Sequence, residues 1–234
     1  MNFENSLISG KLIKRYKRFF IDIKVGNKTV TAHCPNTGSM MGLLDKGNKV
    51  WITKSNNPKR KLKYTLQIIE ISGNKVGVNT HLTNKIVGEA LDNNLIKEFK
   101  NKLIVKSEVN YGKDTRFDFL VTENKKKSFI EVKNVTLSRK NGLAEFPHAI
   151  TSRGLKHIKS LIDATKKGYK SYLLFVIQRE RCDKFSIASD IDLQYAKLLT
   201  TALKQNVKIL CFDCKFLSKG IKLNKKIKFL NYEQ

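Results

Sequence analysis

Acidic residues are scarce in this 234-residue chain, where 20 aspartates and glutamates stand against 46 lysines and arginines, a formal net charge of +26. Lysine far outnumbers arginine, which a coding bias could produce, but such a bias does not account for the shortage of acids. A field this positive indicates a polyanionic partner, with nucleic acid expected ahead of anionic lipid.

Long apolar segments are also missing. The most apolar run extends only from Tyr172 to Ile177, whereas a membrane-spanning helix needs about 20 such residues. The N-terminus has no apolar signal core, so we expect a cytoplasmic protein without a membrane partner. The sequence contains no internal repeat and no low-complexity tract.

Cysteine is limited to four residues. Cys211 and Cys214 have the spacing of a zinc knuckle, but no second pair follows them, and Cys34 and Cys182 are remote in sequence. Two interpretations remain, a pair of reduced thiols at the end of a strand or half of a zinc site. The pattern favours reduced thiols.

The apolar periodicity divides the chain into two predicted domains, residues 1–82 and 83–234. Before Asn79 the pattern is that of β-strands, over residues 12–25, 28–34, 49–54, 62–71 and 75–79. Five short strands with one longer excursion suit a small closed barrel of the oligonucleotide-binding (OB) kind.

From Thr83 onward helical and strand patterns alternate. We expect a helix capped by Asn84 and reaching Phe99, then a strand over 102–109 and a hairpin. A long loop, a helix over 151–168, a strand over 172–177, a helix over 192–205 and a strand over 207–212 follow. This order predicts an α/β (α+β) domain with a mixed sheet covered by helices, in which the long loop is a candidate binding segment or lid.

The predicted hairpin carries the candidate chemistry. Pairing Val121 with Ser128 places Asp118 opposite Glu131 and Arg116 opposite Lys133, all on one face. The other face would then hold the apolar residues Phe117, Phe119, Val121, Ile130 and Val132.

Two opposed carboxylates repel each other unless a cation or a proton lies between them. Asp118 and Glu131 are therefore candidate ligands of Mg²⁺ or Mn²⁺, and Lys133 on the same face could orient a water or stabilise charge on a phosphate. The alternative is a solvated hairpin in which these acids make surface pairs with Arg and Lys.

Basic and aromatic residues interleave in the first domain, which suits phosphate neutralisation and base stacking. The candidate nucleic-acid contacts there are Lys14, Arg15, Lys17, Arg18, Lys59, Arg60 and Lys61, joined by Arg153 and Lys156 on the second predicted helix. The alternative is an exposed basic sheet face whose aromatic residues belong to the core.

Two histidine-containing features have structural alternatives. His33 and Cys34 are neighbours on a strand and would face opposite sides, so we interpret the following Pro35–Ser39 as a shaped turn, either structural or offering N–H groups to a phosphate. For His148 and His157 we expect hydrogen bonds or phosphate contacts rather than metal ligation.

Several long segments resemble the sugar fermentation stimulation protein A family across essentially the whole chain. They are Lys14-Arg-Tyr-Lys-Arg-Phe19, Ala32-His-Cys-Pro-Asn-Thr-Gly38, Asn57-Pro-Lys-Arg-Lys61, Val78-Asn-Thr80, Ser107-Glu-Val-Asn-Tyr-Gly112, Ile130-Glu-Val-Lys-Asn-Val-Thr-Leu137, Phe146-Pro147, Arg153-Gly154 and Lys156-His157. The resemblance implies an N-terminal OB barrel followed by a restriction-endonuclease-like domain of the PD-(D/E)xK type.

Carried onto this sequence, the endonuclease-like motif falls on Asp118, Glu131 and Lys133, with Glu89, Glu108 and Gln178 as weaker additional site residues. One departure concerns His148, where the family usually has Asp after Phe-Pro. The resemblance implies DNA binding, to double- or single-stranded DNA, and a role in regulating sugar (maltose) metabolism.

Three functions are therefore in competition. The first is a DNA-binding protein with a Mg²⁺-dependent nuclease site. We expect its binding to be largely non-sequence-specific, because no helix-turn-helix with a base-reading helix stands out. The second is a non-enzymatic DNA-binding regulator, and the third is an RNA-binding or RNA-processing factor, since OB barrels accept either nucleic acid. The sequence leaves the oligomeric state open.

Overall fold

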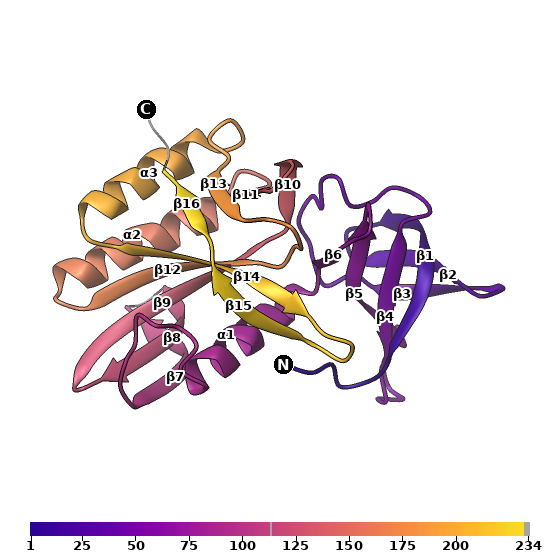
Figure 1. The fold of residues 1–234 in the computed structure, drawn as a ribbon, viewed down its shortest axis with the longest axis horizontal. Coiled ribbons are helices and arrows are strands. Elements are labelled where there is room, and N and C mark those ends of the chain that lie inside the picture. The colour runs from indigo at the N-terminus through magenta and orange to yellow at the C-terminus, as the bar shows by residue number, and fades with distance from the viewer. Residues whose placement is uncertain (113, 232–234) are drawn as a thin grey trace.

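The computed structural model describes residues 1–112 and 114–231 and consists of a β-barrel beside a larger mixed domain (Figure 1). The barrel contains β1 (Leu7–Tyr16), β2 (Phe20–Val25), β3 (Lys28–His33), β4 (Lys49–Lys54), β5 (Tyr64–Ile71) and β6 (Asn74–Gly77). The strand order is β3-β2-β1-β4-β5-β6, and a parallel pairing between β3 and β5 closes the sheet on itself. Alternate apolar residues such as Ile21, Ile23, Val50 and Ile52 fill the interior. The predicted OB barrel is confirmed.

The strand predicted over residues 12–25 is wrong in its continuity, because the chain reverses at Lys17 and Arg18. Both residues have positive φ, 47° and 60°, and Tyr16 pairs with Phe20 across the turn. No Gly or Pro marks this reversal in the sequence, and the residues on each side of it alternate as strand residues do. The basic pair therefore lies at the tip of a hairpin.

The second domain is organised around a sheet of β7 (Leu103–Tyr111), β8 (Thr115–Glu123), β9 (Lys126–Val135), β12 (Lys170–Ile177), β14 (Lys208–Phe216) and β15 (Ile221–Lys226). The order is β15-β14-β12-β9-β8-β7, in which β9, β12 and β14 run parallel and the outer pairings are antiparallel. α1 (Thr83–Asp92) packs in the core on one face, while α2 (Ser152–Lys166) and α3 (Leu193–Lys204) pack in the core on the other. The mixed sheet covered by helices is confirmed.

Capping explains where two of the helices begin. The side chain of Thr151 accepts a hydrogen bond from Gly154 N at the start of α2, and Asp192 accepts one from Tyr195 N at the start of α3. The expectation for α1 was wrong, because this helix follows the short 3₁₀ turn η1 (Thr80–Leu82), ends at Asp92 and is not capped by Asn84. The side chain of Asn84 is instead directed to Asp118.

The predicted long loop before α2 is also wrong, because it forms β10 (Leu137–Lys140) and β11 (Leu143–Phe146). These strands join β13 (Lys184–Ile187) and β16 (Lys228–Leu230) in a second sheet of order β10-β11-β13-β16. β11 pairs in parallel with β13, about 40 residues later in the chain. A local sequence pattern cannot reveal such a pairing.

The barrel meets the second domain through backbone and side-chain bonds at the end of β12. Gly77 N donates to Gln178 O at 2.8 Å, and Lys75 N donates to a carboxylate oxygen of Glu180 at 2.7 Å. The N-terminal residues before β1 also contact the second domain, since Phe3 N donates to Lys219 O. Among the described residues, no helix has the length and apolar character needed to span a membrane.

Candidate active site

The register of the central hairpin is as predicted up to the point where the site begins. Val121 pairs with Ser128, and the ladder between β8 and β9 ends at Phe119 and Ile130. Beyond it, Asp118 Oδ2 accepts the N–H of Val132 at 2.7 Å. If β8 and β9 had continued to pair, the N–H of Val132 would have bonded a backbone carbonyl of β8. The carboxylate of Asp118 accepts this hydrogen bond instead.

This exchange changes the face on which Phe117 lies. Phe117 packs in the core of α2 and α3, with its ring 4.9 Å from that of Phe129, whereas Phe119 packs in the core of α1. The prediction that Phe117 and Phe119 share a face was therefore wrong. The strand leaves its regular pleat where Asp118 bonds the neighbouring strand.

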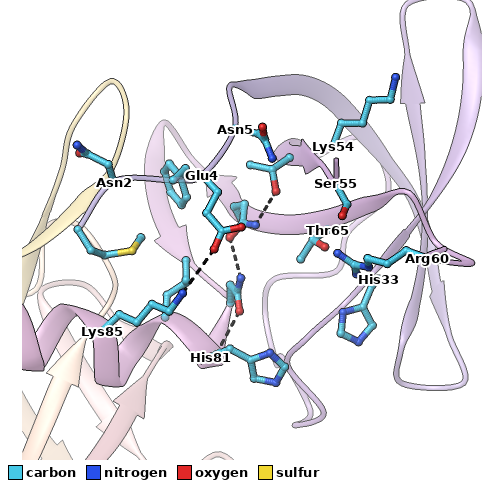
Figure 2. A pocket seen from close by; sticks show the side chains of 16 residues that line it. Asn2, Glu4, Asn5, His33, Lys54, Ser55, Arg60, Thr65, His81 and Lys85 are labelled. Atoms are coloured by element: carbon cyan, nitrogen blue, oxygen red, sulfur yellow. Dashed lines mark hydrogen bonds and ion pairs between the residues drawn. The ribbon is translucent and has the colours of Figure 1, made fainter. Parts of the chain in front are cut away.

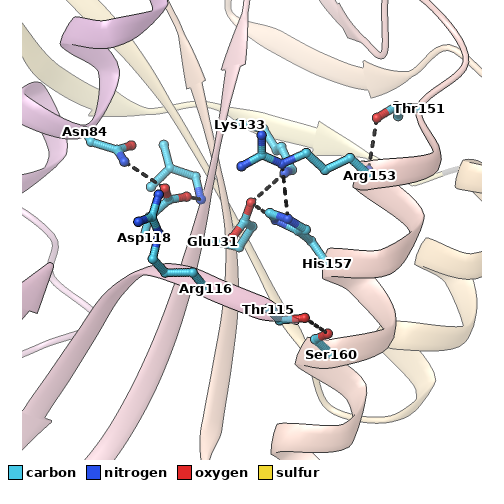
Figure 3. Close-up of polar contacts among 12 residues, drawn as sticks. Asn84, Thr115, Arg116, Asp118, Glu131, Lys133, Thr151, Arg153, His157 and Ser160 are labelled. Atoms are coloured by element: carbon cyan, nitrogen blue, oxygen red, sulfur yellow. Dashed lines mark hydrogen bonds and ion pairs between the residues drawn. The ribbon is translucent and has the colours of Figure 1, made fainter. Parts of the chain in front are cut away.

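Asp118, Glu131 and Lys133 are brought together by β8 and β9 (Figure 3). Lys133 Nζ donates to Glu131 Oε1 at 2.6 Å, and Glu131 is only 2 % exposed. Asn84 Nδ2 donates to Asp118 Oδ1 at 2.7 Å from the first turn of α1. The two acids therefore lie between an amide on one side and an ammonium on the other.

The predicted site did not include His157 or Asn84, although a hydrogen bond was expected for His157 and is confirmed. His157, buried on α2, bonds Glu131 Oε1 through Nδ1, and Arg153 Nε lies 3.4 Å from His157 Nε2 (Figure 3). The spacing of Arg153 and His157 by one helical turn was a signal that they share a face. For Asn84 the sequence offered only a capping signal, which pointed to the wrong role.

The two carboxyl groups have pKa values shifted in opposite directions. Burial and then the charge of Glu131 raise the pKa of Asp118, against the N–H of Val132, the amide of Asn84 and the charge of Lys133. Burial by itself would raise the pKa of Glu131 too, but the hydrogen bond from His157 and the charge of Lys133 outweigh burial and hold it below the ordinary value. Burial and the charge of Glu131 thus favour the protonated form of Asp118, whereas His157 and Lys133 favour the ionised form of Glu131.

The donor set fits a divalent, oxygen-ligated cation. Within the described residues Glu131 Oε2 is buried without a hydrogen-bond partner, beside a second carboxylate whose ionisation it opposes. No group of three or more His, Cys, Asp or Glu side chains in the described part of the chain is arranged as a metal site. Asp118 and Glu131 could hold Mg²⁺ or Mn²⁺, with waters or phosphate oxygens completing the shell, as Mg²⁺ commonly requires.

The additional predicted site residues have different positions. Glu108 is at the rim, where it pairs with Arg116 Nε at 2.7 Å and lies 3.4 Å from Asn84 Nδ2. Glu89 pairs with the amino group of Met1 and has no contact with the trio among the described residues. The buried Gln178 donates to Thr83 and Asn134, and its backbone carbonyl accepts from Gly77 of the barrel, so it lies at the joint between the domains.

The residues predicted to contact nucleic acid differ in their surroundings. Arg15 donates to the carbonyls of Arg18, Asn36 and Gly38, so its guanidinium holds the barrel loops. Arg153 and Lys156 line a surface hollow with Arg116 and His157, next to the acids. The remaining predicted contacts on the barrel, apart from the half-buried Arg60, are exposed: Lys14, Lys17, Arg18, Lys59 and Lys61.

Cys211 and Cys214 lie in different hydrophobic cores, on opposite faces of β14. Burial raises the pKa of the Cys211 thiol to about 12 and that of Cys214 further. Thiols that face opposite ways cannot bind one zinc ion, which agrees with the reduced pair favoured from the sequence. His148 lies against Gly38 of the barrel, and burial lowers its pKa.

Two family models match this chain, one in each domain. The family model described as the sugar fermentation stimulation protein RE domain matches residues 81–220, and the model of the SfsA N-terminal OB domain matches residues 13–78. The chain belongs to the sugar fermentation stimulation protein (SfsA) family.

Relatives in this family match over nearly the full length. The sugar fermentation stimulation protein homolog of Pelagibacter ubique (strain HTCC1062) is 59 % identical, over 99 % of this chain and 100 % of the relative. The homolog of Ruegeria sp. (strain TM1040) is 42 % identical, over 95 % of this chain and 97 % of the relative. The solved structure of Pyrococcus furiosus SfsA in complex with Ca²⁺ has a TM-score of 0.89 at 25 % identity and covers 98 % of each chain.

Proposed function

We propose that this SfsA-family protein binds DNA largely without sequence preference and hydrolyses phosphodiester bonds in a Mg²⁺-dependent reaction. The observation that carries the proposal is the buried pair Asp118 and Glu131, held beside Lys133 at the open end of a ladder. Two adjacent buried acids are costly to hold together unless a cation joins them. A positive surface next to the acids would bring phosphate to that cation.

A divalent cation is supported by a relative as well as by the donor set. The P. furiosus structure is described as a complex with Ca²⁺, and Ca²⁺ and Mg²⁺ both prefer oxygen ligands. When bound, such an ion neutralises charge on the phosphate and lowers the pKa of a coordinated water.

The residues of the chain have separate roles in this proposal. Asp118 and Glu131 bind the ion, and Lys133 Nζ orients the attacking water and stabilises the charge that develops on the phosphate. His157 and Asn84 each hold one carboxylate in place through a hydrogen bond. Arg153 and Lys156 contact the backbone of the DNA strand from α2 and so hold the scissile phosphate next to the acids.

One observation favours a second candidate, a DNA-binding regulator of sugar (maltose) metabolism that does not cut. Glu131 Oε1 is already bonded by both Lys133 and His157, so the chain itself supplies much of the positive charge that a metal would bring. A site satisfied in this way can persist as a structural feature of a binding protein. The two candidates share every binding property and differ only in cleavage.

Cleavage is tested by incubating supercoiled plasmid and single-stranded DNA with the protein and Mg²⁺ or Mn²⁺, with EDTA as the blank. The wild type is expected to cut, and Glu131→Gln is expected to bind DNA with similar affinity but not to cut. The matched control is Asp92→Asn, which neutralises an exposed acid on α1 away from the acid pair.

Intact binding without cutting by the wild type would favour the regulator. Cutting that survives in Glu131→Gln would point to a contaminating nuclease or to another site. Competition between DNA and RNA oligonucleotides of the same sequence decides which nucleic acid is bound, because RNA is the alternative partner of an OB barrel.

A further inference from the structure

A second hollow, of about 460 Å³, lies between the barrel, residues 1–5 and the start of α1 (Figure 2). It shares no lining residue with the acid pair or with the basic hollow beside it. Its volume lies in the range of small-molecule sites, about 300–1,000 Å³. The proposed nuclease function therefore gives this hollow no role.

The floor of the hollow is a fixed chain of polar side chains. Gln67 Nε2 donates to Thr53 Oγ1 at 2.8 Å, Asn79 Nδ2 donates to Gln67 Oε1 at 2.8 Å, and His81 N donates to Asn79 Oδ1 at 3.1 Å (Figure 2). Gln67 and Asn79 are 6 % and 7 % exposed. Because each amide is held by its neighbours, the floor is shaped before any ligand arrives.

The wall of the hollow is positive. His33, His81, Arg60 and Lys54 line it, and within residues 1–112 and 114–231 none of these side chains makes a hydrogen bond or a salt bridge. The acid in the lining, Glu4, is exposed and pairs with Lys85 at 3.6 Å.

The groups in the wall already influence one another. The rings of His33 and His81 lie 6.4 Å apart, and burial, then the charges of Arg60 and His81, lower the pKa of His33. Four cation-forming groups thus surround a built cavity without a counter-charge of their own.

We infer that this hollow binds the phosphomonoester group of a nucleotide. A phosphomonoester carries up to two negative charges and several acceptor oxygens, which match a guanidinium, an ammonium and two imidazoles through charge-assisted bonds. Three segments singled out in the sequence converge here, because His33, Arg60 and Asn79 come from separate motifs. The nucleotide is either free or the phosphorylated end of a nucleic-acid strand, and both present the same group.

Calorimetry measures binding and NMR measures the histidine pKa values on the full chain, and together they distinguish a free nucleotide from a strand end. The probes are thymidine 5′-monophosphate, thymidine, and oligothymidylates with either a 5′-phosphate or a 5′-hydroxyl. The monophosphate is expected to bind and to raise the pKa of His33, because a bound anion offsets the charges of Arg60 and His81. Thymidine, which has no phosphate, is expected to do neither.

The decisive variants are Arg60→Gln in the wall and Lys28→Gln as the matched control, an exposed residue of β3 outside the hollow. Arg60→Gln is expected to weaken monophosphate binding about tenfold or more and Lys28→Gln less than about twofold. A 5′-phosphate that strengthens oligonucleotide binding in the wild type, but not in Arg60→Gln, identifies a strand end as the ligand. Equal affinity of the two oligonucleotides identifies a free nucleotide.

The inference is overturned if the monophosphate does not bind, or if both variants weaken its binding equally. Equal weakening would mean that the net charge of the protein acts at long range. Its failure leaves the nuclease proposal untouched, since cleavage is read from Glu131→Gln and depends on a different set of residues. A loss of cutting alone leaves this inference equally untouched.

Discussion

At the scale of single residues, the acid pair shows how burial and neighbours shift the pKa values of two interacting carboxyl groups in opposite directions. Glu131 is held ionised by His157 and Lys133, whereas Asp118 is bonded by neutral amide groups and faces the charge of Glu131. An ion placed between them would remove the repulsion and let both remain ionised. Without an ion, burial and the charge of Glu131 keep the pKa of Asp118 above its ordinary value.

Replacing Glu131 with Gln is expected to destabilise the metal-free protein by about 2–4 kcal/mol at pH 7, because Lys133 and His157 lose a buried partner. Since the folded-state pKa of Glu131 is lowered, its contribution is present above its unfolded pKa and is lost as the pH falls through its folded pKa. The difference between wild type and variant should therefore shrink at acid pH. Urea denaturation in EDTA at several pH values measures it, and equal stability at pH 7 would contradict it.

Replacing Asp118 tests whether the acid pair binds a metal ion. Asp118→Asn is expected to weaken Mg²⁺ binding about tenfold or more, because one of two charged ligands is lost. Metal that binds only the folded state raises the melting temperature of the wild type, and this rise should be reduced in the variant. Calorimetry and thermal unfolding give the two readouts, with Asp92→Asn as the control. An unchanged affinity in Asp118→Asn would place the ion elsewhere.

At the scale of elements, one aspartate fixes the beginnings of two helices. Asp192 Oδ1 accepts from Tyr195 N at the start of α3, while Oδ2 accepts from Thr151 N just before α2. α2 carries Arg153 and His157, and His157 bonds Glu131. Because Asp192 joins the starts of α2 and α3, the position of α3 also affects how His157 meets Glu131. The same site is completed from the opposite face by α1, through Asn84.

Asp192→Ala is expected to cost about 2–3 kcal/mol of stability, because both helix ends lose a bonded acceptor. Thr151→Ala removes the cap of α2 alone and is expected to cost about 1 kcal/mol. Chemical denaturation compares the two variants. A smaller loss for Asp192→Ala than for Thr151→Ala would show that the shared carboxylate is not what connects the helices.

At the scale of the whole molecule, Gln178 connects the barrel, α1 and β9. Its amide nitrogen donates to Thr83 at 3.0 Å and to Asn134 at 2.7 Å, and its backbone carbonyl accepts from Gly77. Thr83 precedes Asn84 in the chain, and Asn134 follows Lys133. The side chain of Gln178 therefore links the segments that carry Asn84 and Lys133, and its backbone carbonyl links them to the barrel.

Gln178→Ala is expected to destabilise the protein by about 2–4 kcal/mol, because Thr83 and Asn134 lose their bonds to a buried side chain and a small cavity remains. Gln194→Ala, an exposed glutamine on α3, is the control and should change stability by less than about 0.5 kcal/mol. Denaturation followed by tryptophan fluorescence reports on the barrel, since Trp51 lies in β4. Equal stability of the two variants would remove Gln178 from the joint.

The net charge of +26 leads to a prediction for the complete protein. If six or more phosphates are contacted, affinity for duplex DNA should fall about a thousandfold between about 50 and 200 mM salt, because neutralised phosphates release their counterions. Fluorescence anisotropy over a salt series measures the slope. A nearly flat dependence would exclude the basic surface as the main source of affinity.

The sequence by itself determined the two-domain order, the starts of α2 and α3, the register of the hairpin as far as Phe119 and Ile130, and the meeting of Asp118, Glu131 and Lys133. These follow from alternation, capping residues and turn positions, which act over a few neighbouring residues and leave a local pattern. Local patterns also failed in places: residues without a turn signal adopt positive φ at Lys17 and Arg18, Asn84 does not cap α1, and Phe117 does not share a face with Phe119.

Only the tertiary structure decided the features made by contacts between distant segments. The second sheet, the pairing of His157 with Glu131, the turning of Asn84 toward Asp118 and the polar hollow beside α1 all join residues far apart in the chain. Such contacts depend on how elements pack rather than on the order of residues within any one of them. The sequence therefore predicted the acids, and packing selected the groups that hold them.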